Sequence, residues 1–224
     1  MKNDLNIVTT NDGSHSIFSS KFNENYHSKY GSIIEAEHVF IKNGLLATKK
    51  NNVKILEVGF GSGLNTLLTS KYCLSEKIKT DYHSLEIYPI KEDIYNKLNF
   101  YRLVNIKKND FISLHNSKWN VPFIVNKYFK LTKINIDLKK FTTNSRYDII
   151  FFDAFSPEKQ PDLWDIEMFN KMFHLLVKNG FLVTYCAKGV VKRTLKSAGF
   201  KVLDLDGPPG KRQMIRANKL IIQK

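Results

Sequence analysis

The stretch ILEVGFGSGLN, residues 55–65, places three glycines at alternate positions directly after an apolar run. Glycine has no side chain, so Gly59, Gly61 and Gly63 allow a sharp turn and a close approach of a ligand to the main chain. Helical spacing begins at Leu64, and the N-terminus of a helix favours polar or anionic ligand groups. The stretch therefore predicts a strand, a ligand-binding turn and a helix.

From residue 53 onward, apolar runs typical of buried strands alternate with segments of helical periodicity. This alternation requires crossover connections, which predicts an α/β fold with a mostly parallel sheet and helices on both faces. The last two strands, separated by the turn PPGKR, are expected to pair antiparallel at one end of the sheet. The expected strands are 53–59, 81–88, 106–112, 147–155, 181–187, 200–207 and 213–224, and the expected helices are 64–75, 91–103, 165–180 and 189–199.

Two segments lie outside this alternation. Residues 1–50 suggest a short β-rich lead followed by a helix, an N-terminal extension on the substrate side of a catalytic domain formed by residues 51–224. The middle segment, residues 116–141, is too long for a simple connection. Its alternating part, residues 128–138, predicts a β-hairpin inserted between the third and fourth strands, either as a surface elaboration or as part of a substrate wall.

The chain has 35 lysines and arginines against 21 aspartates and glutamates, a formal net charge of +14. This excess favours nucleic acid as a partner over a merely solvated basic surface, because neutralising phosphates releases counterions. Two cysteines and six unclustered histidines predict neither a disulfide framework nor a metal site. Since no apolar stretch has the length of a membrane span and the start does not resemble a signal peptide, the expected location is the cytoplasm.

The spacing of the glycines separates two classes of nucleotide-binding turn. A dinucleotide-binding turn has the order G-x-G-x-x-G, whereas the order here is E-x-G-x-G-x-G, beginning at Glu57. This turn resembles the first motif of S-adenosylmethionine-dependent methyltransferases. Glu86 stands at the expected end of the second strand, where a carboxylate can accept the ribose hydroxyl protons. Asp110 stands at the expected end of the third strand, on the adenine side in such an enzyme, unless it only caps a turn.

Asp153, within the run YDIIFFDAF at residues 147–155, is the candidate catalytic residue. Methyl transfer from a sulfonium needs an aligned and deprotonated nucleophile, and an acid after the fourth strand could hold an amine and accept its proton. The alternative is that Asp153 only caps the following turn. Phe155 and Trp164 are candidates for stacking on a flat substrate, or are simply core aromatics.

Five stretches together resemble the methyltransferase family that forms 5-methylaminomethyl-2-thiouridine at the tRNA wobble position. The resemblance implies a Rossmann-like class I fold with a seven-stranded sheet and an antiparallel C-terminal strand. It implies S-adenosyl-L-methionine as cofactor and N-methylation of the aminomethyl group of 5-aminomethyl-2-thiouridine in the anticodon loop. The family occurs alone or fused to a C-terminal flavin-dependent oxidoreductase, and an end at Lys224 implies the stand-alone form with a separate upstream oxidoreductase. The stretches are residues 12–41, 56–65, 151–164, 184–200 and 207–217.

The resemblance also implies roles for individual residues. Where the family has two arginines after the fifth strand, this chain has Lys192 and Arg193, which keeps the charge but changes the phosphate-binding geometry at position 192. The cofactor turn is matched by Gly59, Gly61 and Gly63 with Glu57 beside it, the ribose position by Glu86, the adenine side by Asp110, the active-site aspartate by Asp153, and its neighbours by Phe155 and Pro157.

Two further groups are candidates for binding the acceptor. Tyr30, Glu35 and Glu37 belong to an early segment that a generic methyltransferase core lacks, and an acidic side chain there could bind a protonated amine or simply face solvent. A wobble base can be turned out of its loop into a pocket, so basic residues around the site would bind phosphates. The expected basic rim consists of Lys188, Lys192, Arg193, Lys211, Arg212 and Arg216.

Other functions stay open at this point. A methyltransferase or aminopropyltransferase acting on a small amine would use the same aspartate, although a chain at +14 would repel cationic substrates. A non-catalytic RNA-binding module with a vestigial turn would bind no cofactor. The glycine spacing disfavours a dinucleotide-dependent oxidoreductase.

Overall fold

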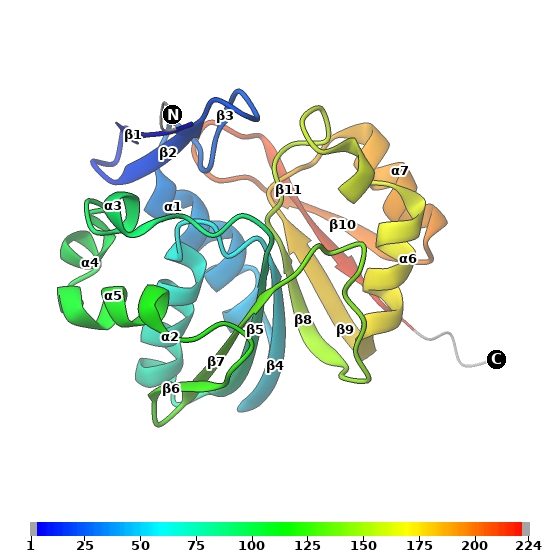
Figure 1. Cartoon of the computed structure of the whole chain (residues 1–224). Helices are drawn as coiled ribbons and strands as arrows, with labels where there is room; N and C mark the ends of the chain where they lie inside the picture. Colours follow the sequence, from blue (N-terminus) through cyan, green and yellow to red (C-terminus); the bar gives the residue numbers. More distant parts are fainter. Residues whose placement is uncertain (1–3, 221–224) are drawn as a thin grey trace.

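The large sheet of the computed structural model, which describes residues 4–220, has eight strands in the order β10-β11-β9-β8-β4-β5-β7-β6 (Figure 1). Strands β9, β8, β4, β5 and β7 run parallel, while β11 and β6 lie antiparallel to their neighbours. The strands are β4 (Asn52–Val58), β5 (Lys79–Glu86), β6 (Phe123–Asn126), β7 (Phe129–Asn135), β8 (Tyr147–Phe152), β9 (Leu176–Thr184), β10 (Lys201–Asp206) and β11 (Gln213–Asn218).

Helices cover both faces of this sheet, as the sequence predicts (Figure 1). Alternate residues of β4 point to opposite faces, so Ile55 belongs to the apolar cluster under α2, whereas Leu56 belongs to the cluster under α6 and α7. The helices after β4 are α2 (Leu64–Glu76), α3 (Glu92–Tyr95), α4 (Phe100–Leu103), α5 (Lys108–Asn116), η3 (Pro161–Leu163), α6 (Ile166–Leu175) and α7 (Gly189–Ser197).

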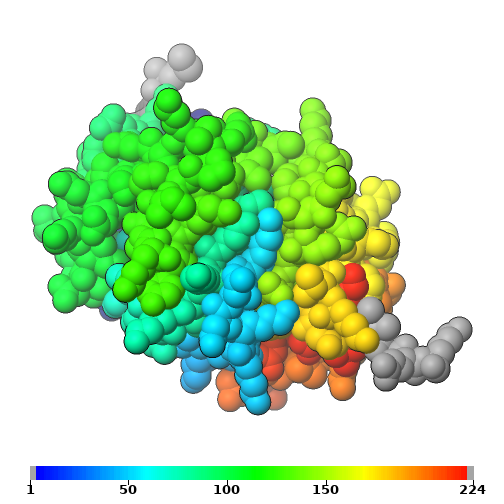
Figure 2. All heavy atoms as spheres, turned by 90° about the horizontal axis from the view of Figure 1, so that it is seen from below, coloured from blue at the N-terminus to red at the C-terminus, as the bar shows by residue number. Residues whose placement is uncertain are grey.

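The N-terminal segment forms a small antiparallel sheet followed by an α-helix that continues as a π-helix. Ile17 and Phe40 from this segment share one apolar cluster with Ile55 and Phe151 of the large sheet. In the view from below, the dark blue of the small sheet is almost hidden, because it lies at the other end of the molecule (Figure 2). The division into residues 1–50 and 51–224 stays a prediction. The elements are β1 (Leu5–Thr9), β2 (His15–Ser19), β3 (Glu24–Asn25), α1 (Ser32–Ala36), η1 (Glu37–Lys42) and η2 (Leu45–Ala47).

The prediction of a third strand at residues 106–112 is wrong. Helix α5 begins at Lys108, and its buried residues Phe111 and Leu114 are three positions apart, the spacing of a helix and not of a strand. The third parallel position is occupied by β7, in which Phe129 and Leu131 are buried at alternate positions. The expected hairpin is therefore the edge of the sheet itself, and the sheet has eight strands where seven were expected.

Several other predictions are confirmed. Strands β10 and β11 pair antiparallel at one end of the sheet, and α2, α6 and α7 follow their strands as expected. The helix expected to reach residue 180 is shorter, however, because α6 ends at Leu175 and β9 begins at Leu176. The helix expected over residues 91–103 is broken into the short helices α3 and α4. The end of the last expected strand, residues 221–224, lies outside the described residues. Within residues 4–220, no helix has the length and apolarity to cross a membrane.

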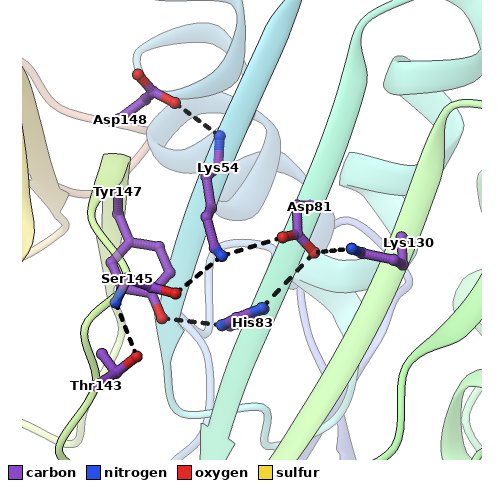
Figure 3. A network of polar contacts seen from close by, with 8 residues as sticks. All are labelled: Lys54, Asp81, His83, Lys130, Thr143, Ser145, Tyr147 and Asp148. Carbon is purple, nitrogen blue, oxygen red and sulfur yellow. Dashed lines mark hydrogen bonds and ion pairs between the residues drawn. The ribbon is translucent and has the colours of Figure 1, made fainter.

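A network of charges occupies the sheet face away from α2, near the amino ends of β4, β5 and β7 (Figure 3). The carboxylate of Asp81 forms ion pairs with Lys54 at 3.1 Å and Lys130 at 3.0 Å, and His83 Nε2 lies 3.6 Å away. His83 Nδ1 lies 2.9 Å from the hydroxyl of Tyr147. Partial burial alone would raise the pKa of Asp81, but His83, Lys130 and Lys54 hold it well below its usual range. Charges therefore cover this part of the sheet.

We expect Asp81→Asn to lower the free energy of unfolding by about 1–3 kcal/mol at pH 7, because three partners lose their shared charge. Since the folded-state pKa of Asp81 is depressed, its contribution is present at neutral pH and is lost as the pH falls below its unfolded value of 3.8. Urea unfolding at pH 7 and in acid measures both effects. Asp162→Asn is the control, because it removes an exposed ion pair with Lys139 and is expected to leave the free energy of unfolding nearly unchanged. An equal loss of unfolding free energy in the Asp81 and Asp162 variants would contradict the prediction.

Candidate active site

A cavity of about 670 Å³ lies at the carboxyl ends of the parallel strands. Ligands of open α/β sheets bind at this edge. The cavity is bounded by the N-terminal segment, the glycine turn after β4, the residues after β5, β7 and β8, the end of β9, and the turn before β11. Segments from both ends of the chain thus build one site.

The glycine turn is fixed by backbone hydrogen bonds and by close packing. The N–H groups of Gly59 and Phe60 both donate to the carbonyl of Leu85, at 3.0 Å. Gly59 has φ +95°, and a Cβ there would lie 2.6 Å from the carbonyl oxygen of Asp153. Gly61 has φ +51°, and a Cβ there would meet the ring of Tyr26 at 3.2 Å. Position 59 therefore requires glycine both for conformation and for space, and position 61 favours it because its φ is positive and the Tyr26 ring is close.

Glu86, at the end of β5, lines the cavity as predicted. Its Oε2 accepts the Gly61 N–H at 2.9 Å and its Oε1 accepts the Tyr88 N–H at 2.8 Å. Burial raises the pKa of Glu86, and these backbone donors oppose the rise. A carboxylate oxygen has further acceptor capacity after one such bond, so Glu86 can also accept hydroxyl protons from a ribose.

Glu57 does not line the cavity; its side chain points toward α2 and is fully buried. Its Oε2 accepts hydrogen bonds from Ser84 and, at 3.1 Å, from Thr66. Burial raises the pKa of Glu57 to about 8, the Ser84 bond opposes this, and the charge of Asp153 adds to it. In this position Glu57 supports the strand ends from behind the turn, while Gly63 forms the N-cap of α2.

Asp110 is not at a strand end, contrary to the prediction. It is exposed in the first turn of α5 and does not line the cavity. The acidic residue beyond the true third strand is Asp137, two positions after the end of β7. It lines the cavity, and its Oδ1 accepts the Lys139 N–H at 2.9 Å. The Ile136 N–H donates to the Glu86 carbonyl at 3.1 Å, so Asp137 lies beside the ribose candidate. The alternation in β7 could have revealed Asp137 from the sequence.

Asp153 directly follows β8 and lines the cavity next to the glycine turn. Its N–H donates to the Val58 carbonyl at 3.0 Å, and its Oδ2 accepts Asn65 Nδ2 at 2.8 Å. Burial raises the pKa of Asp153 to about 7, the Asn65 bond lowers it, the charge of Glu35 raises it and the charge of Lys211 lowers it. A carboxyl group of this kind can gain or lose a proton near neutral pH, as a general base requires.

Glu35, predicted on the acceptor side, is buried and lines the same cavity. Phe155 also lines it, stacked on Phe22 with ring centroids 4.4 Å apart. Tyr30 does not line the cavity but packs against Gly210, and Glu37 lies near the hydroxyl of Tyr72. The early segment thus contributes Glu35 to the cavity wall.

Two residues after β8 do not belong to the cavity wall. Pro157 is half-buried and Trp164 is part of the apolar core, where its ring meets that of Phe152. The Trp164 Nε1–H donates to the Phe155 carbonyl at 2.8 Å. Trp164 therefore holds the loop that carries Phe155, which agrees with the core interpretation of this tryptophan.

The basic rim is distributed differently from the prediction, because Lys211 alone among its six members lines the cavity. Lys188 pairs with Glu158, and Lys192 pairs with Asp204 at 2.7 Å. Arg193 and Arg212 are exposed, and Arg216 lies over the ring of Phe181. Exposed basic residues that do line the cavity are Lys21, Lys29, Lys139 and Lys159.

His27 is a site residue that no sequence pattern indicates. Its Nδ1 lies 3.2 Å from Ser16 Oγ and its Nε2 lies 3.1 Å from Ser62 Oγ within the glycine turn. Burial lowers the pKa of His27 to about 4, against the charges of Glu35 and Asp12. A neutral imidazole therefore links the N-terminal sheet to the turn.

Residues 105–220, more than half of the chain, match the model of a family described as S-adenosyl-L-methionine-dependent methyltransferase. The chain belongs to this methyltransferase family. S-adenosyl-L-methionine is its cofactor, and the residues present fit that molecule: bare backbone at Gly59 and Gly61 for close approach, and the Glu86 carboxylate for ribose hydroxyls.

Similar proteins have more specific names. The chain is 32% identical over 214 residues to the tRNA 5-methylaminomethyl-2-thiouridine biosynthesis bifunctional protein MnmC of Leptospira interrogans, covering 88% of this chain and 33% of that protein. It is 29% identical over 214 residues to the protein of the same name from Burkholderia multivorans, covering 89% and 33%. The chain thus spans about a third of the length of the curated relatives it matches.

Two solved structures support the fold. The crystal structure of MNMC2 from Aquifex aeolicus has a TM-score of 0.79 and 26% identity, covering 97% of this chain and 71% of that one. Spermidine synthase from Thermotoga maritima has a TM-score of 0.59 and 13% identity, covering 96% and 69%, and shows the fold alone. Among the described residues 4–220, no group of His, Cys, Asp and Glu that could hold a metal ion is found.

We expect Asp137→Ala to weaken binding of S-adenosyl-L-methionine about tenfold or more, because it removes a hydrogen-bond acceptor beside Glu86. Asp110→Ala is the matched control and is expected to leave the affinity unchanged, since Asp110 is exposed on α5. Isothermal titration calorimetry on the three proteins measures the difference. A loss of affinity in the Asp110 variant alone would assign the cofactor contact to Asp110 and contradict the role of Asp137.

Proposed function

We propose that this methyltransferase acts on tRNA and methylates the primary amine of 5-aminomethyl-2-thiouridine at the wobble position, giving 5-methylaminomethyl-2-thiouridine. Support comes from the names of its relatives and from the net charge of +14, which suits a phosphate-rich substrate. The exposed lysines that line the cavity would contact the anticodon-loop backbone. The base would be turned out of the loop to reach the cavity.

The observation that carries this proposal is the environment of Asp153. Its carboxylate stands between the cofactor turn and the buried Glu35, and its pKa of about 7 suits a group that removes a proton from an ammonium. Phe155, stacked on Phe22, presents an aromatic wall against which a flat base can lie.

S-adenosyl-L-methionine, when bound, supplies an electrophilic methyl group attached to a sulfonium sulfur, which leaves as a neutral thioether. The chain orients the reaction through Glu86, which can hold the ribose, and through the glycine turn, which lets the cofactor approach the backbone. Asn65 fixes one oxygen of Asp153 and leaves the other to accept the proton of the acceptor amine. Alignment and proton removal are the protein's share of the work.

An upstream activity must supply the primary amine. We propose that a flavin-dependent oxidoreductase removes the carboxymethyl group from the modified uridine before this enzyme acts. The word "bifunctional" in the names of the curated relatives supports a second activity coupled to the methyltransferase.

Incubation with labelled S-adenosyl-L-methionine and tRNA that contains or lacks the aminomethyl group tests the proposed function. We expect label only in 5-methylaminomethyl-2-thiouridine, found by nucleoside analysis. Label in added polyamines would identify a small-amine transferase on this fold instead. Absence of label in every acceptor, with cofactor binding intact, would also overturn the proposal.

Asp153→Ala is expected to lower kcat by a factor of about 100 or more while leaving cofactor affinity nearly unchanged, because it removes the proton acceptor. Single-turnover methylation and calorimetry measure the two effects separately. Asp165→Asn is the control, since Asp165 caps α6 outside the cavity and asparagine also caps helices. An Asp153 variant that simply loses the cofactor would contradict the assigned role.

A further inference from the structure

Glu35 and Lys211 form an ion pair inside the cavity, although they are 176 residues apart in the sequence. Lys211 Nζ lies 2.5 Å from Glu35 Oε1, and the Ser28 N–H donates to Glu35 Oε2 at 2.8 Å. The Glu35 side chain is 11% exposed and that of Lys211 29%. The pair is thus partly withdrawn from water.

The ammonium of Lys211 is fixed from several sides. It lies 4.0 Å from the centre of the Tyr185 ring, and the Tyr185 hydroxyl donates to the Ala154 carbonyl at 2.9 Å, next to Asp153. The turn that carries Lys211 is packed against Tyr30, because a Cβ at Gly210 would lie 2.0 Å from that ring. The fold therefore places a fixed positive charge in the wall that holds Asp153.

Stability does not explain this arrangement well. A buried ion pair recovers little more than the cost of removing its charges from water, and apolar residues of similar size often do as well. Other lysine pairs at this end of the molecule, such as Lys139–Asp162, are far more exposed. The position of the Glu35–Lys211 pair in the cavity wall points to a role in the reaction.

We propose that the Glu35–Lys211 pair is a positioning element that sets the protonation of the acceptor site, with Lys211 favouring the neutral amine and the ionised Asp153, and Glu35 limiting that effect. The proposal rests on the amine acceptor of the proposed function. In the step concerned, one proton passes from the acceptor ammonium to Asp153, leaving a neutral amine and a neutral carboxylic acid. The amine lone pair then forms the N–CH₃ bond, while the electron pair of the breaking C–S bond goes to sulfur.

Asp153 is faced by charged and titratable groups from each element packed around it. Burial raises its pKa, and Glu35 on α1 raises it further, whereas Lys211 lowers it. Glu57 on β4 is a second carboxylate near Asp153, and the charge of Asp153 raises the pKa of Glu57. Tyr185 after β9 stays protonated, because burial raises its pKa well above the usual value and the charge of Asp153 adds to this. The two members of the ion pair thus act on Asp153 with opposite sign.

Opposite sign makes the proposal testable with two variants that break the same ion pair. Lys211→Met leaves Glu35 unbalanced, so the pKa of Asp153 and the acid limb of the kcat–pH profile should rise by about one pH unit. Glu35→Gln leaves Lys211 unbalanced, so the pKa of Asp153 and the acid limb of the kcat–pH profile should fall by a similar amount. In the double variant the pKa of Asp153 should return close to the wild-type value. Lys211→Arg keeps the charge, so it should shift this pKa little.

Two readouts keep this inference separate from the proposed function. The ¹³C chemical shift of the Asp153 carboxyl carbon, assigned by its loss in Asp153→Asn, is titrated in each variant without any acceptor. Methylation of aminomethyl-containing tRNA gives the kcat–pH profiles. Shifts of the carboxyl pKa in the same direction for both single variants, or no shift in either, would overturn the inference even if tRNA is methylated. If the carboxyl pKa shifts in opposite directions in the two single variants but tRNA is not methylated, the charge effect on Asp153 stands and only the proposed tRNA acceptor is overturned.

Discussion

The site depends on how tightly the glycine turn is packed against the neighbouring strand ends. The Leu85 carbonyl accepts two N–H groups of the turn, and the Asp153 N–H donates to the Val58 carbonyl. A side chain at position 59 would collide with the Asp153 carbonyl, so the turn and the candidate base share one contact. Because β4, β5 and β8 are neighbours in the sheet, the cofactor site and the proton acceptor are held in one rigid frame.

Much of this frame could be predicted from the sequence. The alternation of strands and helices, the glycine spacing, Glu86 and Asp153 all follow from local patterns that the fold preserves. The position of Asp110 is not predictable in this way, because a short apolar stretch fits either a strand or a helix, and which one forms depends on the elements that pack over it. The alternating pattern of β7 fits an inserted hairpin as well as a strand of the large sheet, so it does not by itself identify Asp137 as a cavity residue.

Contacts between distant segments could not be predicted in the same way. The sequence suggested that Glu35 binds the acceptor and that Lys211 binds phosphate, and nothing local joins residues so far apart. No local sequence pattern indicates His27 as a site residue either, because its two serine neighbours come from the N-terminal sheet and the glycine turn. Such contacts depend on how the N-terminal segment docks across the edge of the large sheet.

The long separation of Glu35 and Lys211 has a consequence for synthesis of the protein. A chain is made from its N-terminus, and a domain generally folds as a unit. Glu35 is made early, but its counterion Lys211 comes 176 residues later, so the acceptor wall cannot close until Lys211 has been made. The residues that fit the cofactor, Gly59, Gly61 and Glu86, are all made before Lys211. Synthesis of the cofactor turn is therefore complete before the residue that balances Glu35 exists.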